Sequence, residues 1–167
     1  LHPESSFGNR CFPDAAAARY IFTLKSPYFN SLFHPADADL LPKQIFEGSK
    51  IEPRFFVPTI PLILANGSEG IGSGWSQKIL PRNVGTLKKA IKRYLKEGKL
   101  PDRIKPSYRG FKGTIEHVRD NVWEICGSVE IKNTTTIFVT ELPIGITLDR
   151  YTAILAKLED DKVIDYF

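Results

Sequence analysis

The stretch VGTLKKAIKRYLK, residues 84–96, has the apolar spacing of an amphipathic helix. Leu87, Ile91 and Leu95 recur every four residues and would share one face of that helix, with Tyr94 beside them. The other face carries five basic residues: Lys88, Lys89, Lys92, Arg93 and Lys96. Gly98 is placed to end the helix, because glycine readily adopts the left-handed conformation found at helix C-termini.

Strand-forming composition follows this predicted helix. After a loop over 101–111, the segments 113–119, 122–131 and 134–141 are rich in Val, Ile and Thr, with a Trp in the second. Short polar turns separate them, so we expect a three-stranded meander. Thr147 is then placed to cap a last helix with one apolar face. The predicted fold class is therefore mixed α/β.

The residues before 78 have a different composition. The alanine-rich run Asp14–Leu24 predicts a helix, with Asp14 as its N-cap. A strand-like stretch covers Phe55–Ala65, although two prolines within it make a regular central strand unfavourable. Because the composition changes near Lys78, we predict two parts, residues 1–77 and residues 78–167.

Positive charge is concentrated in one region, Lys78–Arg119, called the basic block below. It contains 13 Lys/Arg and 3 Asp/Glu, a net charge of +10, whereas the other residues contain 10 and 16, a net charge of −6. Such asymmetry predicts a polyanionic partner, most simply nucleic acid. A solvated lysine-rich helix is the alternative that the charge pattern alone leaves open.

Several classes of protein are disfavoured by the sequence. No run approaches the roughly 18 apolar residues of a membrane span, and the N-terminus lacks the pattern of a signal peptide. Cys11 and Cys126 are far apart and outside any CxxC pattern, which favours free thiols in a reducing intracellular setting. The absence of methionine predicts a piece of a longer protein.

Tyrosine is a possible nucleophile in this chain. A tyrosine can attack a phosphodiester and store the bond energy as a phosphotyrosine ester, with cationic neighbours stabilising the phenolate. The dipeptide Arg-Tyr occurs three times among six tyrosines, at 19–20, 93–94 and 150–151, so it selects none of them by itself. Packing is the commoner role of tyrosine.

The wider context of Tyr20 is more specific. FGNR (residues 7–10) precedes DAAAARYIFT (14–23), and the blocks IEPRFFVPTIP (51–61) and NGSEGIGSGWS (66–76) follow. In order and spacing, these blocks resemble the active-site region of type IIA DNA topoisomerases. Their residues are closer to those of the eukaryotic and large-DNA-virus branch. The resemblance continues weakly through SYRGFKGTIE (107–116) to Glu141-Leu142-Pro143, and so covers most of the chain.

The resemblance implies a role for several residues. Residues 1–77 would be the end of a winged-helix domain, and residues 78–167 would be part of the α/β tower domain. Tyr20 would attack DNA and Arg19 would steady the scissile phosphate. Arg10 is a further candidate for a contact to the DNA backbone. The basic block would hold phosphates, and four of its lysines are the candidates: Lys78, Lys88, Lys89 and Lys92.

The glycine-dense segment 66–74 does not fit a nucleotide site. Ser73 stands where a Walker A motif requires lysine, and Trp75 occupies the third glycine position of a dinucleotide fingerprint. By resemblance, this segment presents Ile71 as a wedge that enters a base step and bends DNA, which is physically reasonable for an apolar side chain between glycines. The alternative is a tight turn with Ile71 in the core.

For the parent enzyme, the resemblance implies ATP-dependent passage of one duplex through a transient double-strand break in another. Double-stranded DNA is then the partner, a homodimer is expected, and the cofactors are Mg2+ and ATP. We expect neither cofactor site in this chain. Asp37-Ala38-Asp39 resembles a magnesium pair, but it lies in a proline-flanked loop, and the family's acidic cluster belongs to another domain.

The expected compartment is the nucleus for a eukaryotic source, or the host cytoplasm or virus factory for a viral one. This chain alone should not cleave DNA efficiently. A non-catalytic DNA-bending or nucleic-acid-binding module, in which Tyr20 only packs, is the alternative. The basic block disfavours a structural piece that binds no DNA.

Overall fold

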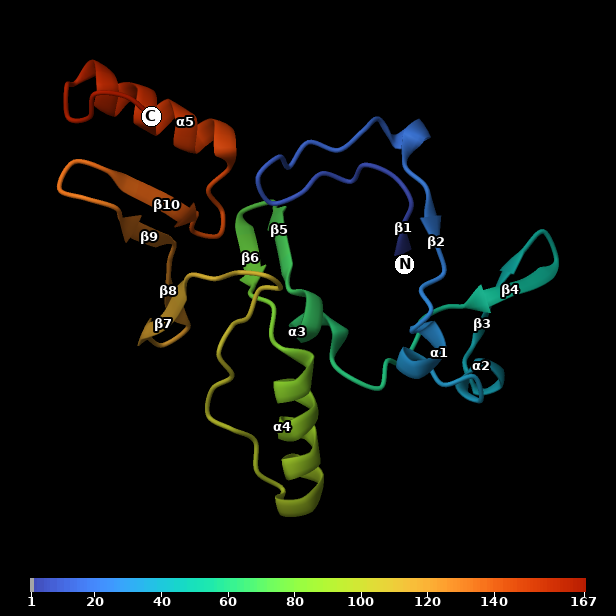
Figure 1. Ribbon diagram of the computed structural model, residues 1–167. Helices are drawn as coiled ribbons and strands as arrows, with labels where there is room; N and C mark the ends of the chain where they lie inside the picture. The colour runs from blue at the N-terminus through green and yellow to red at the C-terminus, as the bar shows by residue number, and fades with distance from the viewer. Residues whose placement is uncertain (1) are drawn as a thin grey trace. The chain divides into compact units, whose positions relative to one another are not determined.

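The computed structural model describes residues 2–167, which form two compact units (Figure 1). One unit consists of the residues up to Leu24 together with Gly110–Phe167. The other consists of Lys25–Arg109. Every sheet that these residues form is a two-stranded antiparallel hairpin or ribbon, so each strand leaves one edge unpaired. The assignment of winged-helix and tower domains stays a prediction.

The basic helix α4, Val84–Glu97, confirms the helix predicted from the apolar spacing. The Asn83 side chain accepts a hydrogen bond from the Thr86 N–H at 3.1 Å, which satisfies one unpaired donor of the first turn. At the other end, Gly98 adopts a left-handed conformation with φ of 67°, and its N–H donates to the Tyr94 carbonyl. The predicted stop at Gly98 is therefore confirmed.

The apolar face of α4 is buried only at its first half. Leu87 is 2% exposed and Ala90 is also buried, whereas Leu95 is 77% exposed. The four-residue spacing predicted one apolar face, and the structure buries that face only in part. Leu87 is the anchor of the helix, because it is the largest fully buried side chain among residues 3–167.

Shortening Leu87 should therefore loosen α4 selectively. We expect Leu87→Ala to lower the free energy of opening by about 2–5 kcal/mol, since it leaves a cavity at a buried site. Leu95→Ala in the same helix should change it by less than about 0.5 kcal/mol. Amide hydrogen exchange of α4 measures both values. Equal losses in the two variants would contradict the assignment of Leu87 as the anchor.

The remainder of this unit contains short helices and two hairpins. The elements are α1 (Phe29–Leu32), α2 (Asp37–Leu40), β3 (Lys43–Phe46), β4 (Ser49–Pro53), α3 (Leu62–Asn66), β5 (Ser68–Gly72) and β6 (Trp75–Ile79). The predicted strand at Phe55–Ala65 is wrong. Pro58 and Pro61 lack the N–H that a ladder needs, and Pro61 instead becomes the N-cap of α3.

The unit that contains the C-terminus is built from two separate hairpins, not from the predicted meander. Strand β7 (Thr114–Arg119) pairs with β8 (Val122–Cys126), and β9 (Ser128–Ile131) pairs with β10 (Ile137–Glu141). The expected middle strand is interrupted at Gly127, where a Cβ would overlap the Glu141 carbonyl. The chain therefore changes its pairing partner at this glycine.

Helix α5, Leu148–Asp160, confirms the last predicted helix. The Thr147 hydroxyl accepts from the Arg150 N–H at 3.3 Å, as the capping pattern predicted. None of the helices that residues 2–167 form is both long and apolar enough to span a bilayer.

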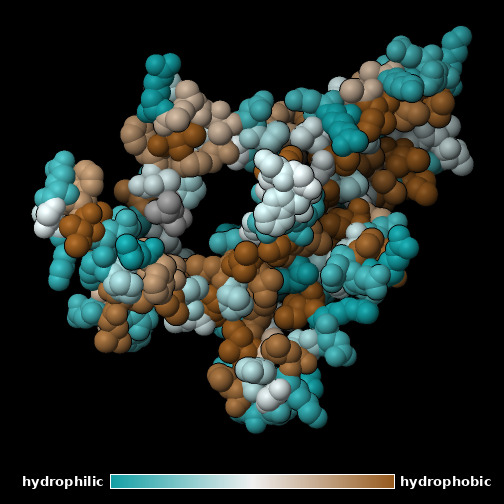
Figure 2. Space-filling model, turned by 180° about the vertical axis from the view of Figure 1, so that it is seen from behind, coloured by the Kyte–Doolittle hydropathy of each residue, from teal (hydrophilic) through white to brown (hydrophobic). Residues whose placement is uncertain are grey.

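Much apolar surface is exposed on these units. The sequence is 42% hydrophobic, a composition that can build a core, yet Leu87, Ala90 and Ile115 are the only buried hydrophobic side chains among residues 3–167. Figure 2 shows apolar residues in brown spread over the visible face, between polar ones. Hydrophobic composition alone therefore did not predict where burial occurs.

Candidate functional site

Tyr20 lies in a long loop rather than in the helix predicted for Asp14–Leu24. Only a single 3-10 turn forms there, η1 (Ala18–Tyr20), and the Asp14 cap is absent. The backbone bonds of this segment instead cross to the arm that precedes it. The Ala16 N–H donates to the Ser6 carbonyl at 3.0 Å, and the Phe22 N–H donates to the Ser5 hydroxyl at 2.8 Å. These cross-arm bonds replace the hydrogen bonds of a helix.

The segments before and after the turn are also joined at the base of the loop, next to β1 and β2. The Glu4 N–H donates to the Phe22 carbonyl at 2.9 Å, and β1 (His2–Pro3) pairs with β2 (Thr23–Leu24). Residues 4–22 therefore form one closed loop, called the tyrosine loop below. Tyr20 lies between the cross-arm bonds at Ala16 and Phe22.

The η1 turn presents Tyr20 to solvent. Its side chain is 59% exposed, and the Tyr20 N–H donates to the Ala17 carbonyl at 2.8 Å. The Arg19 guanidinium lies 5.3 Å from the centre of the Tyr20 ring, within cation–π range. A positive charge is thus held beside an accessible phenol, which is the pairing that phosphoryl attack by tyrosine needs.

The FGNR motif leads into the tight turn at the tip of the tyrosine loop, which spans residues 9–12. Gly8 has a φ of 76°, and a Cβ there would overlap the Pro13 carbonyl, so the position requires glycine. The Asn9 side-chain oxygen accepts from the Cys11 and Phe12 N–H groups at 2.9 and 3.0 Å. The Asn9 N–H also donates to the Phe12 carbonyl at 2.7 Å. Gly8 and Asn9 therefore build the turn from which Arg10 projects.

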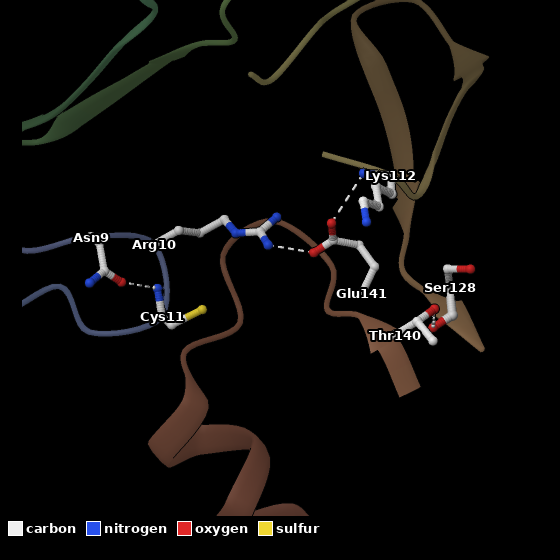
Figure 3. A network of polar contacts seen from close by, with 7 residues as sticks. All are labelled: Asn9, Arg10, Cys11, Lys112, Ser128, Thr140 and Glu141. Carbon is white, nitrogen blue, oxygen red and sulfur yellow. Dashed lines mark hydrogen bonds and ion pairs between the residues drawn. The ribbon is translucent and has the colours of Figure 1, made fainter. Parts of the chain in front are cut away.

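Arg10 is held by Glu141 (Figure 3). An Arg10 Nη2 donates to Glu141 Oε1, and the Lys112 backbone N–H donates to Glu141 Oε2 at 3.1 Å. The guanidinium of Arg10 also lies 5.7 Å from the centre of the Phe111 ring. The phosphate contact predicted for Arg10 therefore faces competition from a carboxylate that already opposes its charge.

The surroundings of Glu141 favour its charged form. Its pKa is lowered by the hydrogen bond from Arg10 first and by the Lys112 N–H next, while desolvation acts in the opposite direction. Because the folded-state pKa lies below the unfolded one, the stabilisation is present at neutral pH. It is lost as the pH falls through the lowered pKa.

Ile71 lies on the β5–β6 hairpin and is 94% exposed. Ile71 precedes the Ser73-Gly74 turn by two residues and pairs with Ser76 on the other strand. It therefore lies near the end of the hairpin rather than at its tip. Its exposure excludes the alternative in which Ile71 lies in a core of this chain. The wedge role stays a prediction.

The four predicted phosphate-binding lysines lie in the same unit as Ile71, and they divide into two groups. Lys88, Lys89 and Lys92 are exposed on α4. Lys78 lies on β6, where its ammonium forms an ion pair with Glu69 at 3.1 Å. Its charge is therefore partly offset within the hairpin, whereas the lysines of α4 are the stronger candidates for phosphate contacts.

The acidic pair Asp37 and Asp39 lies on the single turn of α2. Within residues 3–167, whose side chains the structure describes, no three His, Cys, Asp or Glu gather into a group that could hold a metal ion.

Sequence reasoning missed two residues of the site. Glu141 was recognised only as part of the Glu-Leu-Pro motif, with no role, because its partner Arg10 is 131 positions away. Trp75 is exposed on β6 directly opposite Gly72, which adds a second apolar side chain to the end of the hairpin that carries Ile71. Its place in the NGSEGIGSGWS block was the available signal.

Comparison with known proteins identifies the relatives of this chain. A family model that describes the A subunit of DNA gyrase/topoisomerase IV matches residues 1–167. DNA topoisomerase 2 of Drosophila melanogaster is 39% identical over 153 residues, which are 90% of this chain and 10% of that protein. Human DNA topoisomerase 2-alpha is 42% identical, also over 153 residues that make up 90% of this chain and 10% of that protein. The chain thus spans about a tenth of the length of these curated relatives.

A solved structure agrees with these relatives. The DNA-binding, cleavage and re-ligation domain of Plasmodium falciparum topoisomerase II matches with a TM-score of 0.83 and 38% identity, over 96% of this chain and 22% of that one. The match confirms a mixed α/β fragment of this domain type. Since the family match extends over the whole sequence, the chain belongs to the type II DNA topoisomerases and corresponds to part of their DNA cleavage and re-ligation region.

Proposed function

We propose that this chain supplies the nucleophile of an ATP-dependent type II topoisomerase, and that the nucleophile is Tyr20. The observation that supports this most directly is the exposed Arg19-Tyr20 pair on the η1 turn of a chain that matches the cleavage region. The enzyme would break both strands of one duplex, pass a second duplex through the gap and reseal the break.

The reaction is a reversible transesterification, in which a phosphodiester bond of the DNA is exchanged for a phosphotyrosine bond. The Tyr20 phenolic oxygen attacks the phosphorus and forms a 5′-phosphotyrosine ester, while the 3′ oxygen leaves and takes up a proton. Resealing is the reverse step, in which the 3′ hydroxyl attacks and the phenol departs. Arg19 stabilises the charge on the phosphate oxygens, because a fixed cation is worth most where charge develops. No external energy is needed for either step.

The other residues act on the DNA duplex. Ile71 enters a base step and bends the duplex, which is consistent with its exposure on a narrow hairpin. Lys88, Lys89 and Lys92 hold phosphates without reading sequence. Lys78 and Arg10 are secondary contacts, since each is already paired with a carboxylate.

The parent enzyme would use Mg2+ and ATP and act as a homodimer on double-stranded DNA, in the nucleus if its source is eukaryotic. Among the side chains of residues 3–167, no three His, Cys, Asp or Glu gather into a cluster that could hold a metal ion. Residues 1–77 and 78–167 would be the winged-helix and tower parts.

Peptide mapping of the covalent adduct tests this proposal. DNA cleavage is stopped with denaturant, the DNA is digested with nuclease, and the protein is digested with trypsin. Cleavage after Arg19 and Lys25 releases residues 20–25, and a missed cleavage at Arg19 releases residues 11–25; Tyr20 is the only tyrosine in either peptide. A nucleotide on this peptide supports the proposal. Salt-dependent DNA binding without any adduct would instead favour a non-catalytic DNA-bending module.

Neutralising the exposed lysines of α4 should weaken DNA binding on all sequences equally. We expect replacement of Lys88, Lys89 and Lys92 by glutamine to flatten the slope of log affinity against log salt by roughly 0.9 for each phosphate that the helix no longer binds. Lys157→Gln and Lys162→Gln, which lie outside the basic block, are the matched controls and should leave the slope unchanged. Fluorescence titrations at several salt concentrations measure it. An unchanged slope in the triple variant would show that these lysines of α4 are solvated and bind no phosphate.

A further inference from the structure

One buried carboxylate helps to attach the tyrosine loop to the rest of its unit. Glu141 is 8% exposed and is the only buried charged or polar side chain among residues 3–167, for which the structure describes burial. We propose that Glu141 is a positioning residue for Tyr20, acting through Arg10 on the turn at the tip of the tyrosine loop. This inference rests on the proposed role of Tyr20 as the nucleophile.

Both oxygens of the Glu141 carboxylate accept a hydrogen bond. One oxygen pairs with the Arg10 guanidinium and the other accepts from the Lys112 N–H (Figure 3). Engaging both oxygens in this way fixes the direction of the carboxylate and of the arginine that it binds. A second bond holds the same turn, because the Leu148 N–H at the start of α5 donates to the Cys11 carbonyl at 3.1 Å. The tip of the loop is thus attached at adjacent residues, Arg10 and Cys11.

The loop transmits this anchoring to Tyr20. Between the tip and Tyr20, the two arms are joined by the bond from Ala16 to Ser6, and beyond Tyr20 they are joined by the bonds of Phe22. Movement of the tip therefore displaces both arms together. Because a misplacement of about 1 Å can cost roughly 100-fold in rate, the anchor affects the rate of attack without touching the DNA.

Two roles are possible for Arg10, an anchor of the loop or a contact to a DNA phosphate, and they lead to different expected results. If Arg10 holds a phosphate, its loss weakens DNA binding. If Arg10 and Glu141 act as one anchor, loss of either slows attack at saturating DNA, and loss of Glu141 leaves the affinity for DNA unchanged. Removal of both then costs no more than removal of one, because interacting residues are not additive.

The experiment uses the full-length enzyme and measures two quantities for each variant: the single-turnover rate of Tyr20–DNA adduct formation at saturating DNA, and the DNA dissociation constant. The variants are Arg10→Ala, Glu141→Ala, the double variant and Glu141→Gln. Glu130→Ala, at an exposed carboxylate on β9 of the same hairpin, is the matched control. We expect both single variants and the double variant to lose about 10- to 100-fold in rate. Glu141→Gln keeps one acceptor and should be intermediate, and Glu130→Ala should match the wild type.

Several outcomes would overturn the inference. They are a wild-type rate in Glu141→Ala, additive losses in the double variant, or a weakened affinity in Arg10→Ala with an unchanged rate at saturation. If Glu141→Ala does not fold, Glu141→Gln and Arg10→Lys decide instead, since both keep the volume of the site, and wild-type rates in both would overturn it. Failure of the proposed function itself is distinguishable, because the wild type would then form no adduct at Tyr20.

Discussion

Tyr20→Phe in the full-length enzyme is expected to abolish covalent cleavage of DNA while leaving DNA affinity nearly unchanged. The substitution removes only the phenolic oxygen that would attack phosphorus, and the ring that lies beside Arg19 remains. No other group in the η1 turn, which consists of Ala18, Arg19 and Tyr20, can form a stable ester with the phosphate. The measurement is the amount of DNA-linked protein after denaturation, with affinity measured in parallel by titration.

Tyr94→Phe is the matched control for this result. Tyr94 also follows an arginine and is also exposed, but it lies on α4. We expect it to cleave like the wild type. Arg19→Ala should slow cleavage by about 100- to 1,000-fold, the usual cost of removing one group that stabilises a transition-state charge. Adducts at the wild-type level in Tyr20→Phe would end the assignment of Tyr20 as the nucleophile.

Ile71→Ala is expected to reduce DNA bending and cleavage strongly while leaving the stability of the protein unchanged. Unstacking a base step costs a few kcal/mol, and a wedge that recovers part of that cost is lost with the side chain. Because Ile71 is exposed on β5, its truncation should change the free energy of unfolding by less than about 0.5 kcal/mol. A fluorescence-based bending assay and the midpoint of thermal unfolding are measured on the same variant.

The control for Ile71 is Ile45→Ala, which truncates an exposed isoleucine on β3 of the other hairpin in the same unit. It should affect neither bending nor cleavage. Wild-type bending by Ile71→Ala would remove Ile71 from the site. A clearly lowered unfolding midpoint would instead show that Ile71 is packed in the parent enzyme and would assign its effect to stability.

Family membership and the two long helices were determined by the sequence itself. Helices α4 and α5 follow from local rules: apolar residues at helical spacing, an oxygen-bearing cap at Asn83 or Thr147, and a left-handed glycine at position 98. Each rule acts within a few residues, so it can be read without knowledge of the fold. The motif blocks around Tyr20 and Ile71 were equally readable, since their order is a property of the chain.

The local environment of Tyr20 was decided by tertiary structure. The run Asp14–Leu24 has helical composition, but its backbone donors are satisfied by Ser5 and Ser6 on the opposite arm, and helix propensity is weak enough to be overruled. Likewise, the meander predicted for 113–141 became two hairpins, with the break at Gly127, where the Glu141 carbonyl lies too close for any side chain.

The anchor between Arg10 and Glu141 was decided by tertiary structure alone. Neither residue has a local pattern that indicates the other, and 131 positions separate them. Their attraction becomes specific only in the folded unit, where the carboxylate is buried beside the Lys112 N–H. The sequence therefore identified Tyr20 as the candidate nucleophile, whereas the fold determined which residue holds its loop, because burial and long-range pairing are properties of the folded chain.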